Sequence, residues 1–204
     1  MAKGPEIRSI VFDIGRVLIN LEPDPLIRLL SSYGAGQLSL PHVVSRIRLT
    51  EHESGRLDGR GLLEDLAALV PDPVAHDLLH AKWLDMFELQ TSMVDLAHRL
   101  ASRYRVYLMS NIGDLHWAHL SREFGMHRIG HGALPSYIAG VTKPDPAIYA
   151  QAEVRFGLVP SETVFIDDHE ANIAAARARG WHGIVHRDFA STRDSLEALA
   201  VHTG

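Results

Sequence analysis

Short apolar runs alternate along the chain with longer stretches of helical periodicity. The runs at residues 9–12, 106–109, 164–166 and 183–185 are typical of strands that are buried on both faces. Apolar residues spaced three or four apart predict helices at 92–103, 115–124, 146–156 and 171–179. This alternation predicts an α/β fold, in which helices cover both faces of a doubly wound parallel sheet and form three layers.

One interval departs from this alternation. Residues 21–90 carry helical periodicity throughout and no convincing strand. Turn signals at 33–36, 54–56 and 71–73 would divide the interval into about four short helices. A crossover between two strands needs far fewer residues, so the excess predicts an inserted helical-bundle cap. We therefore expect a core formed by residues 1–20 and 91–204, with residues 21–90 as the cap.

Composition and charge narrow the classes of function. The 204 residues are 46% hydrophobic, which is enough to fill a core. With 20 Lys and Arg against 25 Asp and Glu, the formal net charge of -5 offers no basic surface for nucleic acid or an anionic membrane. The absence of cysteine excludes disulfides, thiolate zinc sites and cysteine nucleophiles. Because no apolar stretch has the length of a signal peptide or a membrane span, we expect a cytoplasmic protein. We expect it to be a monomer or a homodimer.

Polar side chains follow the predicted strands, at the sheet edge where parallel sheets bind their ligands. Asp13 ends the first apolar run, Ser110 and Asn111 follow the second, and Asp167 and Asp168 follow the third. Two adjacent carboxylates at the end of a buried strand repel each other unless a cation or a proton lies between them. The pair therefore indicates a cation site more strongly than either residue alone.

Lys143 lies in GVTKPDPAIY, directly before a predicted helix. Taken singly, each of these positions has an ordinary explanation: a lone Asp is usually a helix cap or turn former, and a Lys-Pro pair is usually a solvated helix start. Together they supply a cationic lysine, hydrogen-bonding groups and three carboxylates. Magnesium-assisted phosphoryl transfer requires this set, because carboxylates hold a hard cation and fixed donors stabilise charge on the transferring group.

The four segments IVFDIGRVLI, VYLMSNIGD, GVTKPDPAIY and TVFIDDHEAN identify a family. In order and spacing they resemble the four motifs of the haloacid dehalogenase-like (HAD) hydrolase superfamily, over nearly the whole chain. The resemblance implies a Rossmann-like core, and the insert is similar to the helical-bundle caps of one subgroup. FDIGRVLI and SNIGDLH are most similar to bacterial sugar-phosphate phosphatases of the α-D-glucose 1-phosphate type. The implied activity is a magnesium-dependent phosphatase acting on a small phosphorylated metabolite, such as a sugar phosphate.

The resemblance also implies roles for residues around the metal. Asp13 would attack phosphorus and form an aspartyl-phosphate that water then hydrolyses. Mg²⁺ would be held by Asp13, by the backbone carbonyl of Gly15 and by Asp168. Asp167 and Asn172 would orient the waters of the metal.

Other residues would bind the substrate by the same resemblance. Lys143 would neutralise charge on Asp13 and on the phosphoryl group, while Ser110 and the backbone amide of Asn111 would bind phosphate oxygens. Arg16 and Glu53 are further expected substrate-binding residues. Glu53 begins the segment 53–56, which falls where caps of this type place a turn over the active site. The alternative is an ordinary turn between two helices.

Gly15 departs from the family pattern. Most phosphatases of the superfamily carry an aspartate there, which protonates the leaving oxygen and later activates water. One hypothesis is that the protein prefers substrates whose leaving oxygen is already acidic, such as anomeric sugar 1-phosphates. Another is that a cap histidine takes over the role, and the candidates are His42, His52, His76 and His80. Arg16 cannot serve, because a guanidinium keeps its proton near neutral pH.

Two other functions remain open. A 2-haloacid dehalogenase also lacks the second aspartate, but its pattern has tyrosine in place of Gly15, and dehalogenation has no use for the metal that Asp167 and Asp168 favour. A chelator would distinguish the two enzymes. A non-catalytic protein that binds a phosphometabolite would instead bind phosphate with magnesium and show no turnover.

Overall fold

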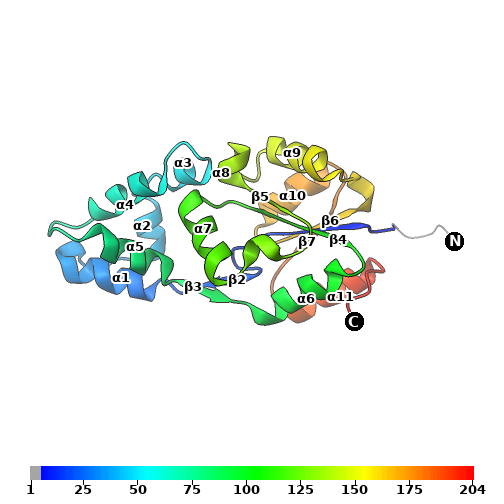
Figure 1. Cartoon of the computed structure of the whole chain (residues 1–204), viewed down its shortest axis with the longest axis horizontal. Helices are drawn as coiled ribbons and strands as arrows, with labels where there is room; N and C mark the ends of the chain where they lie inside the picture. The colour runs from blue at the N-terminus through cyan, green and yellow to red at the C-terminus, as the bar shows by residue number, and fades with distance from the viewer. Residues whose placement is uncertain (1–5) are drawn as a thin grey trace.

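The computed structural model describes residues 6–204 and has three layers (Figure 1). The central sheet is parallel throughout and has the strand order β5-β4-β1-β6-β7. The strands are β1 (Ser9–Phe12), β4 (Arg105–Ser110), β5 (Ala133–Pro135), β6 (Thr163–Asp167) and β7 (His182–Val185). Along the chain, the strands after β1 are added on one side of it, first β4 and then β5. The next strand, β6, lies on the other side of β1, and β7 follows it outward. The crevice between β1 and β6 is therefore the topological switch point, where doubly wound sheets bind ligands.

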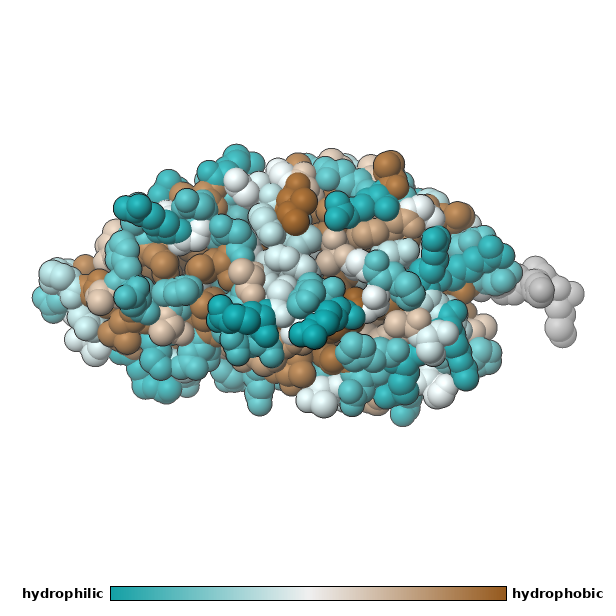
Figure 2. Space-filling view, viewed as in Figure 1, coloured by the Kyte–Doolittle hydropathy of each residue, from teal (hydrophilic) through white to brown (hydrophobic). Residues whose placement is uncertain are grey.

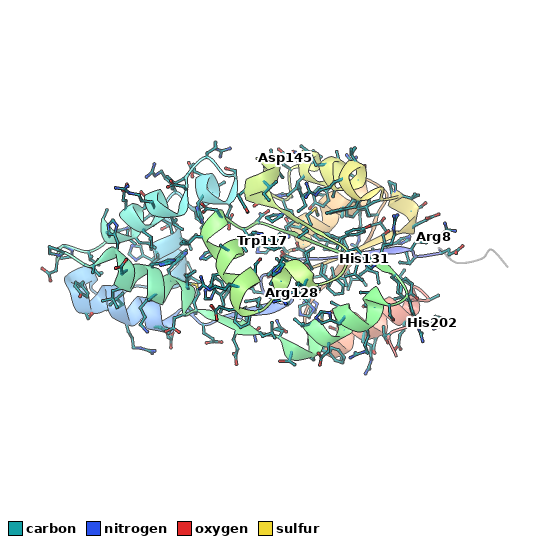
Figure 3. The ribbon with its side chains drawn as sticks, in the orientation of Figure 1. Arg8, Trp117, Arg128, His131, Asp145 and His202 are labelled. Carbon is teal, nitrogen blue, oxygen red and sulfur yellow. The ribbon has the colours of Figure 1, made fainter. Side chains whose placement is uncertain are left out.

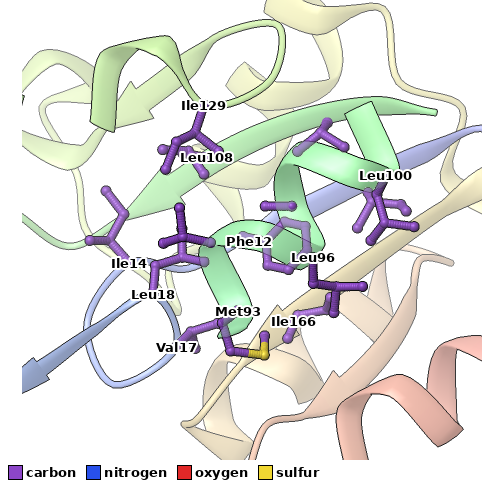
Figure 4. Close-up of a cluster of buried hydrophobic side chains, with 14 of the residues drawn as sticks. Phe12, Ile14, Val17, Leu18, Met93, Leu96, Leu100, Leu108, Ile129 and Ile166 are labelled. Carbon is purple, nitrogen blue, oxygen red and sulfur yellow. The ribbon is translucent and has the colours of Figure 1, made fainter. Parts of the chain in front are cut away.

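Two buried clusters hold the helices to the sheet. Side chains alternate across β1, so that Ile10 and Phe12 pack on one face and Val11 on the other. The first face is covered by α6 (Thr91–Ala101) and α11 (Phe189–Ala198). Helix α6 contributes Met93, Leu96 and Leu100 (Figure 4), and α11 contributes Leu196. The second face is covered by α9 (Pro146–Phe156) and α10 (Glu170–Ala178). Both faces of the sheet are thus buried, and its strands consist of nearly continuous apolar runs.

A group of short helices lies at one end of the molecule (Figure 1). They are α1 (Asp24–Leu30), the π-turn η1 (Ser31–Ala35), α2 (Leu40–Val44), α3 (Leu49–Glu53), α4 (Gly59–Ala67) and α5 (His76–Leu84). A hydrophobic cluster that includes Leu26, Leu62, Leu79 and Trp83 holds them together. An antiparallel ribbon of β2 (Ile19–Leu21) and β3 (Phe87–Leu89) connects this group with the sheet.

The predicted fold class is confirmed: a doubly wound parallel sheet with helices on both faces and a helical insert after the first strand. The expectation of no strand within residues 21–90 is wrong, because β3 lies there. Its three residues are too few to show a period of two, and its partner β2 is far away in sequence. β5, also three residues long, escaped prediction for the same reason.

The boundaries 1–20, 21–90 and 91–204 stay a prediction, and residues 1–5 lie outside the part that the structure describes. Within residues 6–204, no helix is long and apolar enough to cross a membrane. On the face seen in Figure 2, hydrophobic residues lie in small groups among hydrophilic ones.

Candidate active site

Three carboxylates gather at the crevice between β1 and β6. Asp13 continues the pairing of these strands, since its backbone N–H donates to the Ile166 carbonyl at 2.9 Å. Asp167 is the last residue of β6, and Asp168 follows it. Each of the three aspartates has an oxygen within 4.8 Å of the others. The parallel pairing therefore brings together residues that are more than 150 positions apart, as expected for strand-end residues.

Lys143 lies between two of these carboxylates. Its Nζ is 2.9 Å from Asp13 Oδ1 and 2.6 Å from Asp167 Oδ2, and its side chain is only 1% exposed. Burial alone would lower the pKa of the ammonium, but the charges of Asp13 and Asp167 outweigh it and raise this pKa. Lys143 therefore stays charged at neutral pH.

Asn111 fixes the backbone of Lys143. Its side-chain amide donates to the Lys143 carbonyl at 2.9 Å, and its Oδ1 accepts from the Lys143 N–H at 2.7 Å. The two hydrogen bonds hold the loop that carries the lysine against the end of β4. The sequence predicted a role for the Asn111 backbone amide, but it did not predict this role for the side chain.

Asp13 and Asp167 differ in their hydrogen bonding. Burial raises the pKa of Asp13 to about 6, with a smaller contribution from the charge of Asp167, against the lowering effects of Lys143 and a hydrogen bond from Ser110. Both oxygens of Asp167 already have donors in Lys143, the His169 N–H and the Asn172 amide. Asp167 and Asn172 thus form a hydrogen-bonded group next to Asp13. Their expected role, to orient the waters of the metal, stays a prediction.

Asp168 has the most open carboxylate of the three. Its closest cationic neighbour is Arg16, whose Nη1 lies 3.9 Å from Asp168 Oδ2. Arg16 itself is mostly exposed and has a positive φ of 57°. Three carboxylates against Lys143 and a loosely placed Arg16 leave a negative excess, and the oxygen donors suit a hard divalent cation. Asp13 and Asp168 are the two aspartates whose carboxylates can still coordinate a metal ion, so the residues present fit a magnesium site.

A cavity of about 150 Å³ opens beside this cluster. Its lining includes Gly15, Ser110 and Asn111 from the strand ends, and Glu53 and Trp83 from the helical insert. The rest of the lining is mainly aliphatic and aromatic, with His116 of α7 (Asp114–Glu123) as a further polar group. The cavity is thus enclosed between the sheet and the inserted helices, next to the carboxylates.

Glu53 reaches this cavity from the end of α3. Burial raises the pKa of its carboxyl to about 7; the nearby Lys143 charge opposes this shift, and the Asp13 charge adds to it. The Glu53 backbone carbonyl accepts a hydrogen bond from Ser136 Oγ at 2.5 Å. Glu53 thus lines the cavity, while the expectation that the segment 53–56 discriminates between substrates stays a prediction.

The histidines of the site differ from those expected. None of His42, His52, His76 and His80 is among the residues that line the cavity. His52 is fully buried, and its Nδ1 lies 3.1 Å from the Leu57 carbonyl. His116 and Trp83, which the sequence analysis did not single out, stack at 5.1 Å between ring centroids. Burial, with smaller effects of His52 and His119, lowers the pKa of His116 to about 3, so its ring is neutral at pH 7.

The turn after Glu53 depends on Gly55. This glycine has a φ of +73°, and a Cβ on it would lie 2.4 Å from the Tyr137 carbonyl oxygen of α8 (Ser136–Ala139). We expect Gly55→Ala to cost about 1–2 kcal/mol for the left-handed conformation alone and to move the turn away from α8. Urea denaturation and catalytic assays would measure both effects. Gly157→Ala is the control, because Gly157 has a similar φ of +62° but a Cβ on it would meet no heavy atom within 4 Å. If both variants lost equal activity, the close contact at Gly55 would have no part in shaping the site.

A second, larger cavity of about 850 Å³ lies away from these carboxylates. It is lined by residues near the start of β1 and β4, including Arg8, His131 and His202, at the far end of the molecule from the inserted helices (Figure 3). Unlike the smaller cavity, it is lined by none of Gly15, Ser110 and Asn111. The smaller cavity is therefore the one that adjoins the candidate chemistry.

The chain is similar in sequence to known hydrolases. The sequence model of the haloacid dehalogenase-like hydrolases matches residues 7–180. A D-ribitol-5-phosphate phosphatase of Bacteroides thetaiotaomicron is 27% identical over 205 residues, which cover 95% of this chain and 98% of that protein.

Two solved structures have a similar fold. A HAD family enzyme of B. thetaiotaomicron, in complex with magnesium and inorganic phosphate, is 24% identical with a TM-score of 0.76, covering 89% of this chain and 94% of that one. A HAD-like hydrolase of Porphyromonas gingivalis is 25% identical with a TM-score of 0.72, covering 94% and 98%. The similarity extends over both the sheet and the inserted helices.

Proposed function

The chain belongs to the haloacid dehalogenase-like hydrolase family, and from this premise we propose that it is a magnesium-dependent phosphatase of a small phosphorylated metabolite. The observation that carries the proposal is the cluster of Asp13, Asp167 and Asp168 around Lys143, beside a small cavity. It combines a carboxylate nucleophile, a fixed cation and a site for a divalent metal.

The geometry supports a division of roles. Asp13 attacks phosphorus and carries the phosphoryl group as an aspartyl-phosphate, which water hydrolyses in a second step. Lys143 reduces the repulsion between the Asp13 carboxylate and the dianionic phosphoryl group. Ser110 and the backbone amide of Asn111 bind phosphoryl oxygens, since both residues line the cavity. Asp13, the Gly15 carbonyl and Asp168 would hold Mg²⁺, which when bound supplies further positive charge to the phosphoryl oxygens.

The cavity favours a small leaving group. Its volume of about 150 Å³ is well below the roughly 300–1,000 Å³ of pockets for drug-sized ligands. The relative named above is a phosphatase of D-ribitol 5-phosphate, and by analogy we propose a sugar phosphate or sugar-alcohol phosphate as the substrate class. An anomeric sugar 1-phosphate, expected from Gly15 and from the α-D-glucose 1-phosphate type, stays a prediction within that class. Glu53, in the lining of the cavity, and Arg16, next to Asp168, are proposed to contact the substrate.

The alternatives make different demands on the site. A haloacid dehalogenase needs the nucleophile but no metal ion, whereas a bound metal ion would explain the open carboxylate of Asp168. A non-catalytic binder of phosphometabolites needs no activated nucleophile, whereas Lys143 and Ser110 both contact Asp13. The geometry therefore favours the phosphatase.

Removal of the metal tests the proposal. In EDTA, turnover of 4-nitrophenyl phosphate and sugar phosphates should fall at least about a thousandfold, because metal polarisation of the phosphoryl group supplies several kcal/mol and about 1.4 kcal/mol is tenfold in rate. Added magnesium should restore the rate, and Asp168→Asn should require a higher magnesium concentration. Asp95→Asn, on the exposed face of α6, is the matched control. Full turnover in EDTA would contradict a magnesium phosphatase, and dehalogenation of a 2-haloacid in EDTA would establish the alternative.

A further inference from the structure

The site needs a proton donor that Gly15 does not supply. When the P–O bond of an alkyl phosphate breaks, the leaving oxygen must gain a proton, and a positioned acid typically accelerates this step about 100- to 10,000-fold. Two titratable side chains line the adjoining cavity within residues 6–204: Glu53 and His116. The neutral His116, whose pKa lies near 3, has no acidic proton to give at pH 7.

Glu53 is held in place relative to the phosphate-binding residues. Ser136 Oγ donates to the Glu53 carbonyl and accepts from the Ile112 N–H at 2.9 Å. Ile112 directly follows Ser110 and Asn111. One hydroxyl thus joins the end of α3 to the loop after β4, and the close approach of Gly55 to Tyr137, the residue after Ser136, fixes the same turn.

The Glu53 carboxyl is also able to donate a proton. No hydrogen bond or ion pair engages it within residues 6–204, in contrast to the carboxyls of Asp13 and Asp167. It faces the cavity on the side of the inserted helices, whereas Asp13 lies at the sheet edge. The leaving group of a phosphate bound at Asp13 would occupy the space between them. With its pKa raised to about 7, the carboxyl is protonated in a large fraction of molecules at neutral pH.

Together these observations lead us to propose, on the basis of the phosphatase function above, that Glu53 is the catalytic acid and base of this protein, acting from the cap side. As the Asp13 oxygen bonds to phosphorus and the P–O bond breaks, Glu53 gives its proton to the leaving oxygen and the alcohol departs. Glu53, now a carboxylate, then takes a proton from the water that attacks the aspartyl-phosphate. Phosphate leaves, and both carboxyls return to their starting states.

Glu53→Gln separates this role from simple substrate binding. Gln has the same size, and the carboxyl has no partner to lose, so the fold should be retained. We expect kcat/KM for D-ribitol 5-phosphate or another alkyl phosphate to fall about 100- to 10,000-fold. For 4-nitrophenyl phosphate, whose leaving oxygen is acidic and needs no proton, kcat/KM should fall less than about tenfold. Glu51→Gln, on the same helix and outside the cavity lining, is the matched control.

A second change should restore the lost step. Gly15 has no positive φ, and a Cβ on it would meet no heavy atom within 4 Å, so Asp is accommodated there. Since Gly15 also lines the cavity, Gly15→Asp should return part of the alkyl phosphatase activity to the Glu53→Gln protein.

The possible failures are distinct. If the wild-type protein hydrolyses no phosphate ester with magnesium, the proposed function fails, and this inference fails with it. If the wild-type protein hydrolyses both substrates and Glu53→Gln slows both by the same factor, the phosphatase stands and Glu53 is not its acid. A Glu53→Gln protein that is impaired on the alkyl substrate alone establishes the acid.

Discussion

Replacing Asp13 with Asn is expected to abolish phosphatase activity and to leave the fold intact. Removal of a covalent nucleophile in a well-studied hydrolase lowers kcat by roughly a millionfold, and we expect a loss of at least about four orders of magnitude here. The Asn side chain can still accept from the Ile14 N–H and from Lys143, the two donors that now contact Asp13 Oδ1. The loss would therefore reflect chemistry and not unfolding.

Three measurements check this result. Steady-state rates with magnesium should show the loss, urea denaturation should show a free energy of unfolding close to that of the wild type, and ³²P-labelled substrate should label the wild type but not the variant. Asp145→Asn is the matched control. Asp145 caps α9 by accepting from the Ala147 N–H at 2.8 Å, and Asn caps a helix equally well. Substantial labelled or hydrolytic activity in Asp13→Asn would contradict the covalent role.

The sequence predicted the strand-end residues well because parallel strands impose their own geometry. Asp13, Ser110 and Asp167 each end a strand whose apolar run is visible in the sequence, and β1 lies between β4 and β6. Once the sheet is parallel, these residues meet at one edge. Helix α9 begins at Pro146, as predicted, because an aspartate cap and a proline in the first turn define a helix start locally.

What the sequence could not predict depends on contacts between the inserted helices and the core. Whether Glu53 or one of the cap histidines faces the site is decided by the hydrogen bond from Ser136 and by the close approach at Gly55, both of which join segments more than 80 residues apart. The stacking of Trp83 on His116 likewise joins an inserted helix to α7. No local pattern records such contacts, so periodicity could identify these helices but not the side of them that lines the cavity.

The proposed roles of Gly15 and Glu53 depend on each other. The hypothesis that Gly15 confers a preference for acidic leaving groups assumes that no other acid is present. If Glu53 is the acid, the wild-type protein should hydrolyse alkyl phosphates well, and the predicted preference should emerge in Glu53→Gln. Rates on glucose 1-phosphate and glucose 6-phosphate, measured for the wild type and for Glu53→Gln, would show which residue determines the preference for an acidic leaving group.

Lys143→Met should have the largest effect on stability. Methionine retains the unbranched apolar stem, but it leaves Asp13 and Asp167 buried without their shared cation. Breaking a buried ion pair from one side typically costs about 3–5 kcal/mol, so we expect a loss of this size in EDTA at pH 8, together with loss of activity. Lys82→Met is the matched control, because Lys82 pairs with Asp85 on the surface at 2.7 Å, where such pairs contribute about 0–1 kcal/mol.

The deficit of Lys143→Met should depend on pH in a defined direction. Burial raises the pKa of Asp13 from 3.8 to about 6, so the folded chain binds this proton more tightly than the unfolded chain does. In the metal-free wild type, Asp13 therefore lowers the free energy of unfolding as pH rises from about 4 to 6. Without the ammonium this pKa rises further, the lost stability extends to higher pH, and protonation at pH 5 removes much of the repulsion. Urea denaturation in EDTA should thus show a smaller deficit at pH 5 than at pH 8. An equal deficit at both pH values would mean that the variant is destabilised by lost packing of the lysine side chain and not by repulsion between the two carboxylates.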